Sequence, residues 1–313
     1  MIDITAQNFE AELINASMQQ PVLLDIWAPW CGPCKTLGPL LEKLETAYAG
    51  RFRLGKLNAD EQPEIAAQLS QMFGVRSIPF CVLFKDGQPL DGFVGALPEA
   101  QVRQFLDKHV PSAEEAAAEE EVSQAQTLLA EGDPERALEK LQEAVAIDPA
   151  NEGARYDYVR ALLLAGRVVD ARRAFDAVAG KAVLDARLTA AGHWLAACEK
   201  AASARPADTL AAAIAANKRD FDARFELAQA HFAAQRFTQA MDELLEIVMR
   251  DKSWNGELAR KTYIAILELM AKPAPKAAAT QAKGTLEVAG KNVVASTDPV
   301  VDQYRRKLSM ALF

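Results

Sequence analysis

The chain has 313 residues, 50% of them hydrophobic and 25% charged, and its 35 Lys and Arg against 43 Asp and Glu leave a net charge of -8. This length suggests two domains, and this composition excludes a wholly disordered or fibrous chain. The acidic balance disfavours nucleic acid as a partner, because phosphate backbones repel an acidic protein. No segment reaches 18 uncharged apolar residues, and residues 1–10 lack the basic and apolar regions of a secretion signal. We therefore expect a cytoplasmic protein that has no membrane partner.

The first 110 residues have mixed character. The apolar runs of strand length are Val22–Trp27 and Phe80–Phe84, and the helical stretches are Pro39–Ala49 and Glu99–His109. This alternation predicts an α/β domain. Asp86-Gly87 lies between Cys81–Phe84 and Gln88–Leu90 and predicts a hairpin turn with at least one antiparallel strand pair, so we expect a mixed sheet.

Cys31 and Cys34 stand in the segment Trp27–Lys35, which follows an apolar strand and opens a helix. Backbone N–H groups and the helix dipole stabilise a thiolate at such a position, so the first cysteine becomes a nucleophile. The second cysteine, one turn deeper, can attack the mixed disulfide that the first forms with a substrate. The spacing therefore predicts a redox-active pair.

The same pair has an alternative interpretation as half of a zinc site. Cys81 and Cys198 do not form a second close pair, and His109, His193 and His231 show no ligand spacing. We therefore predict no metal site. Cys81 in an apolar strand and Cys198 in a helix are typical of small buried hydrophobic residues.

Over residues 1–110 the chain resembles thioredoxin, through the dithiol segment and several further positions. These positions are Asp25, Lys56, Pro39, Ile78-Pro79 and Gly95. The resemblance implies a thioredoxin-like fold and a thiol–disulfide oxidoreductase that needs no cofactor besides the Cys31–Cys34 disulfide. It implies that Cys31, Cys34, Asp25 and Lys56 are catalytic, and that Trp30, Ile78, Pro79 and Gly95 bind substrate. Phe80 departs from the family, which usually has Thr beside its cis-proline.

From about residue 111 the composition changes to Ala, Glu, Gln and Leu with helical spacing, and a pattern of apolar positions repeats at steps of 34, 35 and 34 residues. The repeated positions are Ala137, Leu141, Ala144; Ala171, Phe175, Val178; Pro206, Leu210, Ala213; and Ala240, Leu244, Ile247. This period resembles the tetratricopeptide repeat, whose helix pairs bury their apolar faces by stacking. Pro206 breaks the pattern in the third unit, and a helical bundle without a groove is the alternative.

The remaining boundaries follow from composition. We predict a helical connector at 111–118, tetratricopeptide-like repeats with a capping helix at 119–271, a flexible linker at 272–297 and an amphipathic helix at 298–313. Asp298-Pro299 is typical of a helix start. Such a tethered helix either docks on its own repeats or inserts into the groove of a partner.

The order of these parts resembles the bacterial chaperedoxin family (CnoX/YbbN), as do Asp86–Phe93 and Tyr304–Leu308 locally. The resemblance implies a holdase that binds unfolding client proteins and passes them to the chaperonin. It implies that Tyr304, Arg305, Arg306, Leu308 and Leu312 face a partner. Some members carry a cysteine where this chain has Ala59, and some lack a working dithiol.

Three functions remain open at the level of sequence. The first is a co-chaperone that also reduces client disulfides and takes electrons from a thioredoxin-reductase-type donor. The second is a general thiol–disulfide oxidoreductase whose helical repeats only recruit partners. The third is a repeat scaffold in which the first domain is a rigid cap.

Overall fold

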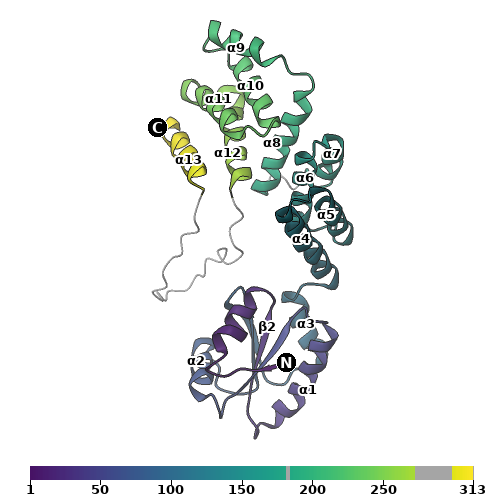
Figure 1. The fold of residues 1–313 in the computed structure, drawn as a ribbon. Coiled ribbons are helices and arrows are strands. Elements are labelled where there is room, and N and C mark those ends of the chain that lie inside the picture. The colour runs from purple at the N-terminus through teal and green to yellow at the C-terminus, as the bar shows by residue number, and fades with distance from the viewer. Residues whose placement is uncertain (181–183, 272–297, 313) are drawn as a thin grey trace. The chain divides into compact units, whose positions relative to one another are not determined.

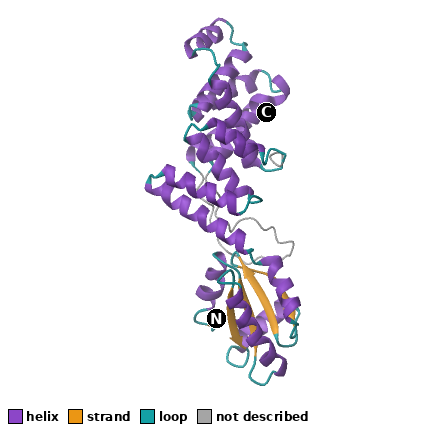
Figure 2. Ribbon diagram, turned by 90° about the vertical axis from the view of Figure 1, so that its right-hand side faces the viewer, coloured by secondary structure: helices purple, strands orange, loops and turns teal. Residues whose placement is uncertain are grey.

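The computed structural model describes residues 1–180, 184–271 and 298–312. They form two compact units, the first covering residues 1–116 and the second beginning at residue 117 (Figure 1). The first unit combines strands and helices, and the described part of the second is helical (Figure 2). The predicted fold class, a thioredoxin-like α/β domain followed by an all-α repeat domain, is confirmed. The predicted linker at 272–297 lies outside the described residues.

Five strands form the sheet of the first unit, in the order β1-β3-β2-β4-β5. They are β1 (Ile2–Asp3), β2 (Val22–Trp27), β3 (Arg53–Asn58), β4 (Phe80–Lys85) and β5 (Gln88–Val94). Both β1 and β2 run parallel to β3, whereas β4 is antiparallel to β2 and β5, so the sheet is mixed as predicted. Asp86 and Gly87 make the predicted hairpin turn with φ values of +54° and +75°.

Helices cover both faces of this sheet. They are η1 (Phe9–Asn15, a π-helical segment), η2 (Ala16–Met18, a 3-10 turn), α1 (Gly32–Ala47), α2 (Pro63–Phe73) and α3 (Glu99–His109). Side chains of α1 and α3 pack on one face, around Leu23 of β2, and side chains of α2 pack on the other, around Leu24. Successive residues of β2 point to opposite faces, which is why one strand serves both cores. The predicted helix Pro39–Ala49 overlaps α1, which begins earlier, at Gly32, and ends at Ala47, two residues before the predicted end.

Within the described residues, nine helices follow α3 in succession, and the first of them begins just before the boundary between the two units. They are α4 (Ala113–Glu131), α5 (Pro134–Ile147), α6 (Glu152–Leu164), α7 (Val168–Asp176), α8 (Ala186–Ala201), α9 (Ala207–Ala216), α10 (Phe221–Ala233), α11 (Phe237–Arg250) and α12 (Trp254–Met270). The predicted connector at 111–118 supplies the start of α4, which continues through it to Glu131. The predicted capping helix is α12.

Ten of the twelve repeated positions lie on every second helix, namely α5, α7, α9 and α11, as the 34-residue period requires, and Val178 follows the end of α7. Most of them are buried, but Pro206 precedes α9 as its N-cap and is exposed. Leu210 and Ile214 of α9 pack in a small cluster of their own with α10, apart from the main core. The third of the four helical repeats is therefore the irregular one, as the sequence indicates.

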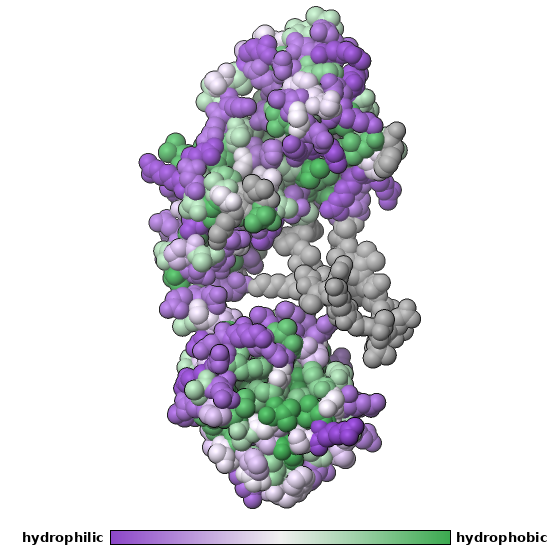
Figure 3. Space-filling model, turned by 180° about the vertical axis from the view of Figure 1, so that it is seen from behind, coloured by the Kyte–Doolittle hydropathy of each residue, from purple (hydrophilic) through white to green (hydrophobic). Residues whose placement is uncertain are grey.

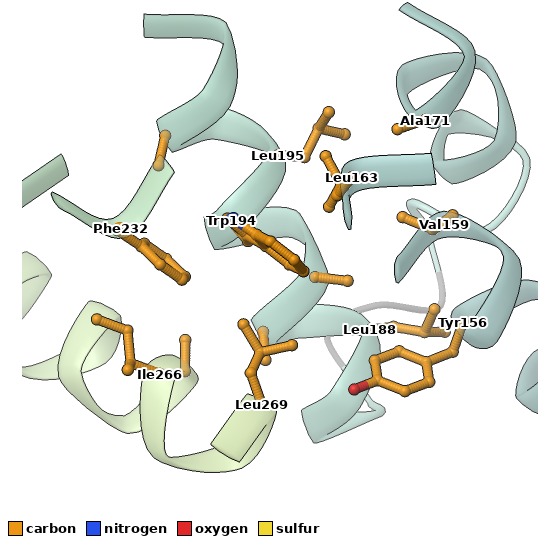
Figure 4. Close-up of a cluster of buried hydrophobic side chains, with 14 of the residues drawn as sticks. Tyr156, Val159, Leu163, Ala171, Leu188, Trp194, Leu195, Phe232, Ile266 and Leu269 are labelled. Carbon is orange, nitrogen blue, oxygen red and sulfur yellow. The ribbon is translucent and has the colours of Figure 1, made fainter. Parts of the chain in front are cut away.

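Trp194 of α8 lies at the centre of the main core of the second unit (Figure 4). Its indole stacks on Phe232 of α10 at 6.4 Å between ring centroids, with 15° between the planes. Ile266 and Leu269 of α12 belong to the same cluster. The capping helix α12 therefore packs on α8 as well as on the preceding helix α11.

The terminal helix α13 (Pro299–Leu312) packs on α11 and α12. Asp298 caps it, because its side chain accepts a hydrogen bond from the Val300 N–H at 2.9 Å. Tyr304 is 6% exposed, and its hydroxyl donates to Asp242 of α11 at 3.0 Å. The Tyr263 hydroxyl of α12 donates to the Tyr304 carbonyl oxygen at 2.8 Å. Of the two alternatives for this helix, the structure shows the one in which it packs on its own repeats.

We predict that Tyr304→Ala releases α13 from the repeats. Truncating a buried aromatic side chain costs about 3 kcal/mol, and the hydrogen bond to Asp242 is lost as well. Hydrogen exchange of the α13 amides, measured by mass spectrometry on the whole protein, should become much faster. The control is Arg306→Ala, which changes an exposed side chain of the same helix and should leave protection unchanged. Equal protection in both variants would contradict the packing.

Candidate active site

The dithiol lies at the N-terminus of α1, directly after β2. Cys31 is the N-cap of this helix, and its sulfur accepts a hydrogen bond from the Cys34 N–H at 3.2 Å. The two cysteines form a disulfide and are 3% and 5% exposed, respectively. In the reduced state, the helix N-terminus would stabilise a thiolate on Cys31 through this N–H and the helix dipole. The arrangement is therefore suited to nucleophilic attack on a disulfide.

The loop before β4 approaches the disulfide. The Ile78–Pro79 peptide bond is cis, and the Ile78 side chain packs against the small cluster formed by Ala28, Cys31 and Cys34. The Gly95 N–H donates to the Pro79 carbonyl oxygen at 2.8 Å, and the φ of Gly95 is +85°, a conformation that favours glycine. The structure thus brings three of the predicted substrate-binding residues, Ile78, Pro79 and Gly95, to one place beside the dithiol.

Trp30, the fourth predicted substrate-binding residue, directly precedes the disulfide and is 70% exposed. Its indole N–H donates to Asp60 Oδ1 at 3.1 Å, which ties the exposed ring to the turn after β3. A large exposed aromatic ring beside a dithiol offers an apolar contact to a second chain. Apolar side chains also gather on one face of this unit, with polar side chains around them (Figure 3).

Asp25 lies on β2 beneath α1 and is 1% exposed. Burial raises the pKa of its carboxyl from 3.8 to about 6. The positive charge of Lys56 and a hydrogen bond from Cys81 both oppose this rise, while Glu42 adds to it. At neutral pH the carboxyl is therefore mostly ionised but holds a proton far more readily than an exposed aspartate does.

Lys56 is the residue of β3 that pairs directly with Asp25 of β2 in the sheet. Its ammonium forms an ion pair with Glu42 of α1 at 2.9 Å and lies 5.3 Å above the centre of the Trp27 ring. The predicted pair of Asp25 and Lys56 is thus adjacent in the sheet. The charge of Lys56 acts on Asp25 through space, whereas the direct ion-pair partner of Lys56 is Glu42.

Cys81 belongs to this group, although sequence reasoning treats it as a small buried hydrophobic residue. It is completely buried, and its sulfur lies 3.7 Å from Asp25 Oδ1. Burial and the nearby Asp25 raise the pKa of its thiol well above 9.0. The one signal in the sequence is that both residues belong to buried apolar strands, but only the register of β2 and β4 brings them opposite each other.

Phe80, the departure beside the cis-proline, points away from Asp25. It packs in the core under α2, where its ring meets Phe73 edge to face at 5.5 Å. The aromatic side chain therefore fills the second core of the sheet, on the face opposite to Cys81.

The predicted partner-binding residues of α13 belong to the second unit and divide between two environments. Tyr304 and Leu308 are buried against the chain's own helices, and Leu312 is half-buried against the same core. Arg305 and Arg306 are exposed. Contact of these two arginines with a partner stays a prediction, whereas Tyr304 and Leu308 can reach a partner only if α13 leaves its position.

Metal-binding clusters and membrane-spanning helices are both absent from the described residues. Across residues 1–180, 184–271 and 298–312, no three His, Cys, Asp or Glu side chains are grouped so that they could hold a metal ion. No helix within those ranges has the length and apolar character needed to cross a membrane.

We predict that Asp25→Asn stabilises the protein in a pH-dependent way. The raised pKa of Asp25 means that its contribution to folding stability is fully present below about pH 4 and is lost as the pH rises through about 6. The variant should therefore be more stable than the native protein by about 3 kcal/mol at pH 8, and by little at pH 4. Urea unfolding of both oxidised proteins at the two pH values measures this. Asp3→Asn, at an exposed carboxyl, is the control, and an equal difference at both pH values would contradict the assignment.

Comparisons with known proteins agree with both units. Residues 1–108 match the thioredoxin family model, and residues 128–194 and 200–283 match tetratricopeptide repeat models. Thioredoxin 1 of Nostoc sp. is 40% identical over 107 residues, which are 34% of this chain and 94% of that protein. Thioredoxin of Haemophilus influenzae is 42% identical over 110 residues, 35% of this chain and 97% of that protein. Thioredoxin 2 of Chlorobaculum tepidum is 44% identical over 108 residues, 34% of this chain and 94% of that protein.

These relatives are matched over nearly their whole length, and residues 1–108, which match the family model, contain the dithiol, the cis-proline loop and the buried carboxylate. The helical region beyond it is of a type that mediates protein–protein interaction. The chain therefore belongs to the thioredoxin family, as a thiol–disulfide oxidoreductase whose thioredoxin domain is followed by tetratricopeptide repeats.

Proposed function

We propose that this protein is a cytoplasmic co-chaperone, a holdase that binds unfolding proteins, passes them to the chaperonin and reduces their disulfides. The observation that carries the proposal is the presence of a thioredoxin domain and a protein-binding repeat domain in one chain. A dithiol alone reduces whatever disulfide reaches it. Repeats on the same chain hold a client near it and raise the effective concentration of the client's disulfides.

The reductase reaction follows from the positions of the two cysteines. The Cys31 thiolate attacks one sulfur of a client disulfide, forms a mixed disulfide with it and releases the other client sulfur as a thiolate. Cys34 gives its proton to Asp25 and then attacks the Cys31 sulfur. The Cys31–Cys34 bond forms, and the second client thiolate leaves. Two electrons pass to the client, and the protein is left in the oxidised form that the structure contains.

The buried carboxylate supports this assignment of roles. A base that accepts the Cys34 proton at neutral pH needs a pKa of about 6 or 7, so that it is ionised but can still hold a proton. Burial raises the pKa of Asp25 to about 6. We assign the charge of Lys56 the task of keeping this carboxylate ionised, and we assign Trp30, Ile78, Pro79 and Gly95 to contacts with the client chain.

The chaperone part of the proposal is supported by the repeats and by the resemblance to chaperedoxins. Stacked helix pairs leave a long surface on which an extended or partly folded chain can lie. Several large apolar side chains of this domain are exposed, among them Val169, Met249 and Leu164. Contact with unfolding clients through such side chains needs no cofactor, and we propose none besides the dithiol.

The terminal helix is the proposed contact to the chaperonin. Its arginines Arg305 and Arg306 are exposed in the docked position, whereas Tyr304, Leu308 and Leu312 become available when α13 detaches. Electrons for the next cycle come, in this proposal, from a thioredoxin-reductase-type protein that reduces the Cys31–Cys34 disulfide.

We predict that Cys34→Ser traps a client on Cys31 as a mixed disulfide. A serine hydroxyl in place of the Cys34 thiol cannot resolve the bond, so the covalent complex should accumulate and should disappear on addition of dithiothreitol. The measurement is mass spectrometry under non-reducing conditions, after incubation with a disulfide-containing protein. Cys31→Ser is the matched control and should trap little, because Cys34 is not the N-cap of α1. Equal trapping by both variants would contradict the assignment of Cys31 as the attacking cysteine and Cys34 as the resolving one.

We predict that holdase activity survives loss of the dithiol. The native protein and the Cys31→Ser, Cys34→Ser double variant should suppress the aggregation of a heat-unfolded, disulfide-free enzyme equally well, as measured by light scattering. Reduction of insulin disulfides should be lost in the double variant alone. If neither protein suppresses aggregation, the repeats only recruit partners and the protein is a general thiol–disulfide oxidoreductase, which is the second candidate function.

A further inference from the structure

Three side chains form a row across the sheet beneath α1. The register pairs Asp25 of β2 with Lys56 of β3 on one side and with Cys81 of β4 on the other. Paired residues of neighbouring strands point to the same face of a sheet, so these side chains lie next to one another. Leu23, Leu54 and Leu83 form part of the apolar core on the same face, and Asp3 and Asp91 lie toward its edges. The chain thus places a thiol beside a fully buried carboxylate.

The contact between Cys81 and Asp25 has the geometry of a hydrogen bond from sulfur. The Cys81 sulfur lies 3.7 Å from Asp25 Oδ1, and both side chains are almost entirely shielded from water. The pKa of the Cys81 thiol is raised by burial and by Asp25, so the sulfur keeps its proton. An ionised carboxylate can only accept a hydrogen bond, so the thiol is the donor.

The other charged groups around Asp25 act on it without such a bond. Lys56 on β3 favours the ionised carboxylate by its charge, but its ammonium is paired with Glu42. Glu42 on α1 disfavours the ionised form. Within the described part of the chain, Cys81 is therefore the one side chain that donates a hydrogen bond to the Asp25 carboxylate.

We propose that Cys81 is a positioning residue for the reductase reaction. Its S–H orients the Asp25 carboxylate and favours the ionised form of this group, which then accepts the Cys34 proton. The proposal rests on the role given to Asp25 above. Cys81 itself forms no bond to the client and exchanges no electrons. In the resolving step, the proton moves from the Cys34 sulfur to Asp25, the Cys34–Cys31 bond forms, and the Cys31–client bond breaks with its electron pair on the client sulfur.

The first test measures the titration of Asp25 directly. The carboxyl carbon of Asp25 is followed by NMR in the full-length oxidised protein over a range of pH. Cys81→Val removes the donor and should raise the midpoint by about 0.5 to 1 pH unit, the size expected for loss of one weak hydrogen bond to a charged group. Cys81→Ser keeps a donor and should return the midpoint close to the native value. Cys198→Ser, at the other free cysteine, should leave it unchanged.

The second test measures the reaction. The acid limb of the pH profile of kcat for insulin reduction should move upward in Cys81→Val by the same amount as the NMR midpoint, with KM unchanged, and should return in Cys81→Ser. If the midpoint of the Asp25 titration is unchanged in Cys81→Val, the proposed effect of the Cys81 hydrogen bond on Asp25 is wrong. A shifted midpoint with an unmoved acid limb overturns the link from Cys81 through Asp25 to the reaction. Absence of reductase activity in the native protein instead overturns the proposed function, while the NMR titration still reports on the bond.

Discussion

Burial of strand β2 on both of its faces is the constraint on which the active site depends. Side chains from Val22 to Ile26 are fully buried because α1 and α3 cover one face of the sheet and α2 covers the other. A carboxylate in such a strand loses its water, which is why the pKa of Asp25 is raised to about 6. The same strand ends at Trp27, and the chain then turns into α1 with Cys31 at its N-cap. One element therefore supports both the dithiol and the buried carboxylate behind it.

The second unit depends on a different kind of burial. Each of its helix pairs is too small to bury an apolar face alone, so α12 packs on α8 and α11, and α13 packs on α11 and α12. The last contact is partly polar, with Tyr304, Asp242 and Lys307 grouped at its edge. Polar contacts at an exposed edge are weaker than apolar burial, so α13 is held mainly by Val301, Tyr304 and Leu308, which are buried in the main core.

The two units divide the proposed function between them. In the proposed function the chemistry of the dithiol is local, because it uses the N-terminus of α1, the cis-proline loop and the row formed by Lys56, Asp25 and Cys81. In the proposed function, the repeats add a surface for clients to that of the thioredoxin domain. Because α4 connects the two units covalently, a client held by the repeats would meet the dithiol of the same molecule in an intramolecular step.

Much of this protein is readable from its residues. Several predictions rest on local patterns, which can be recognised without knowledge of the fold. They are the spacing of Cys31 and Cys34, the turn at Asp86-Gly87, the 34-residue period and the helix start at Asp298-Pro299. The tertiary structure alone decided which side chains meet. Cys81 reads as an ordinary core residue until the antiparallel register of β2 and β4 sets its thiol against Asp25. Tyr304 reads equally well as an inward or an outward side chain, since an amphipathic pattern defines a face and not the surface that covers it. Contacts between distant segments depend on register and packing, and neither is encoded in the periodicity of a single segment.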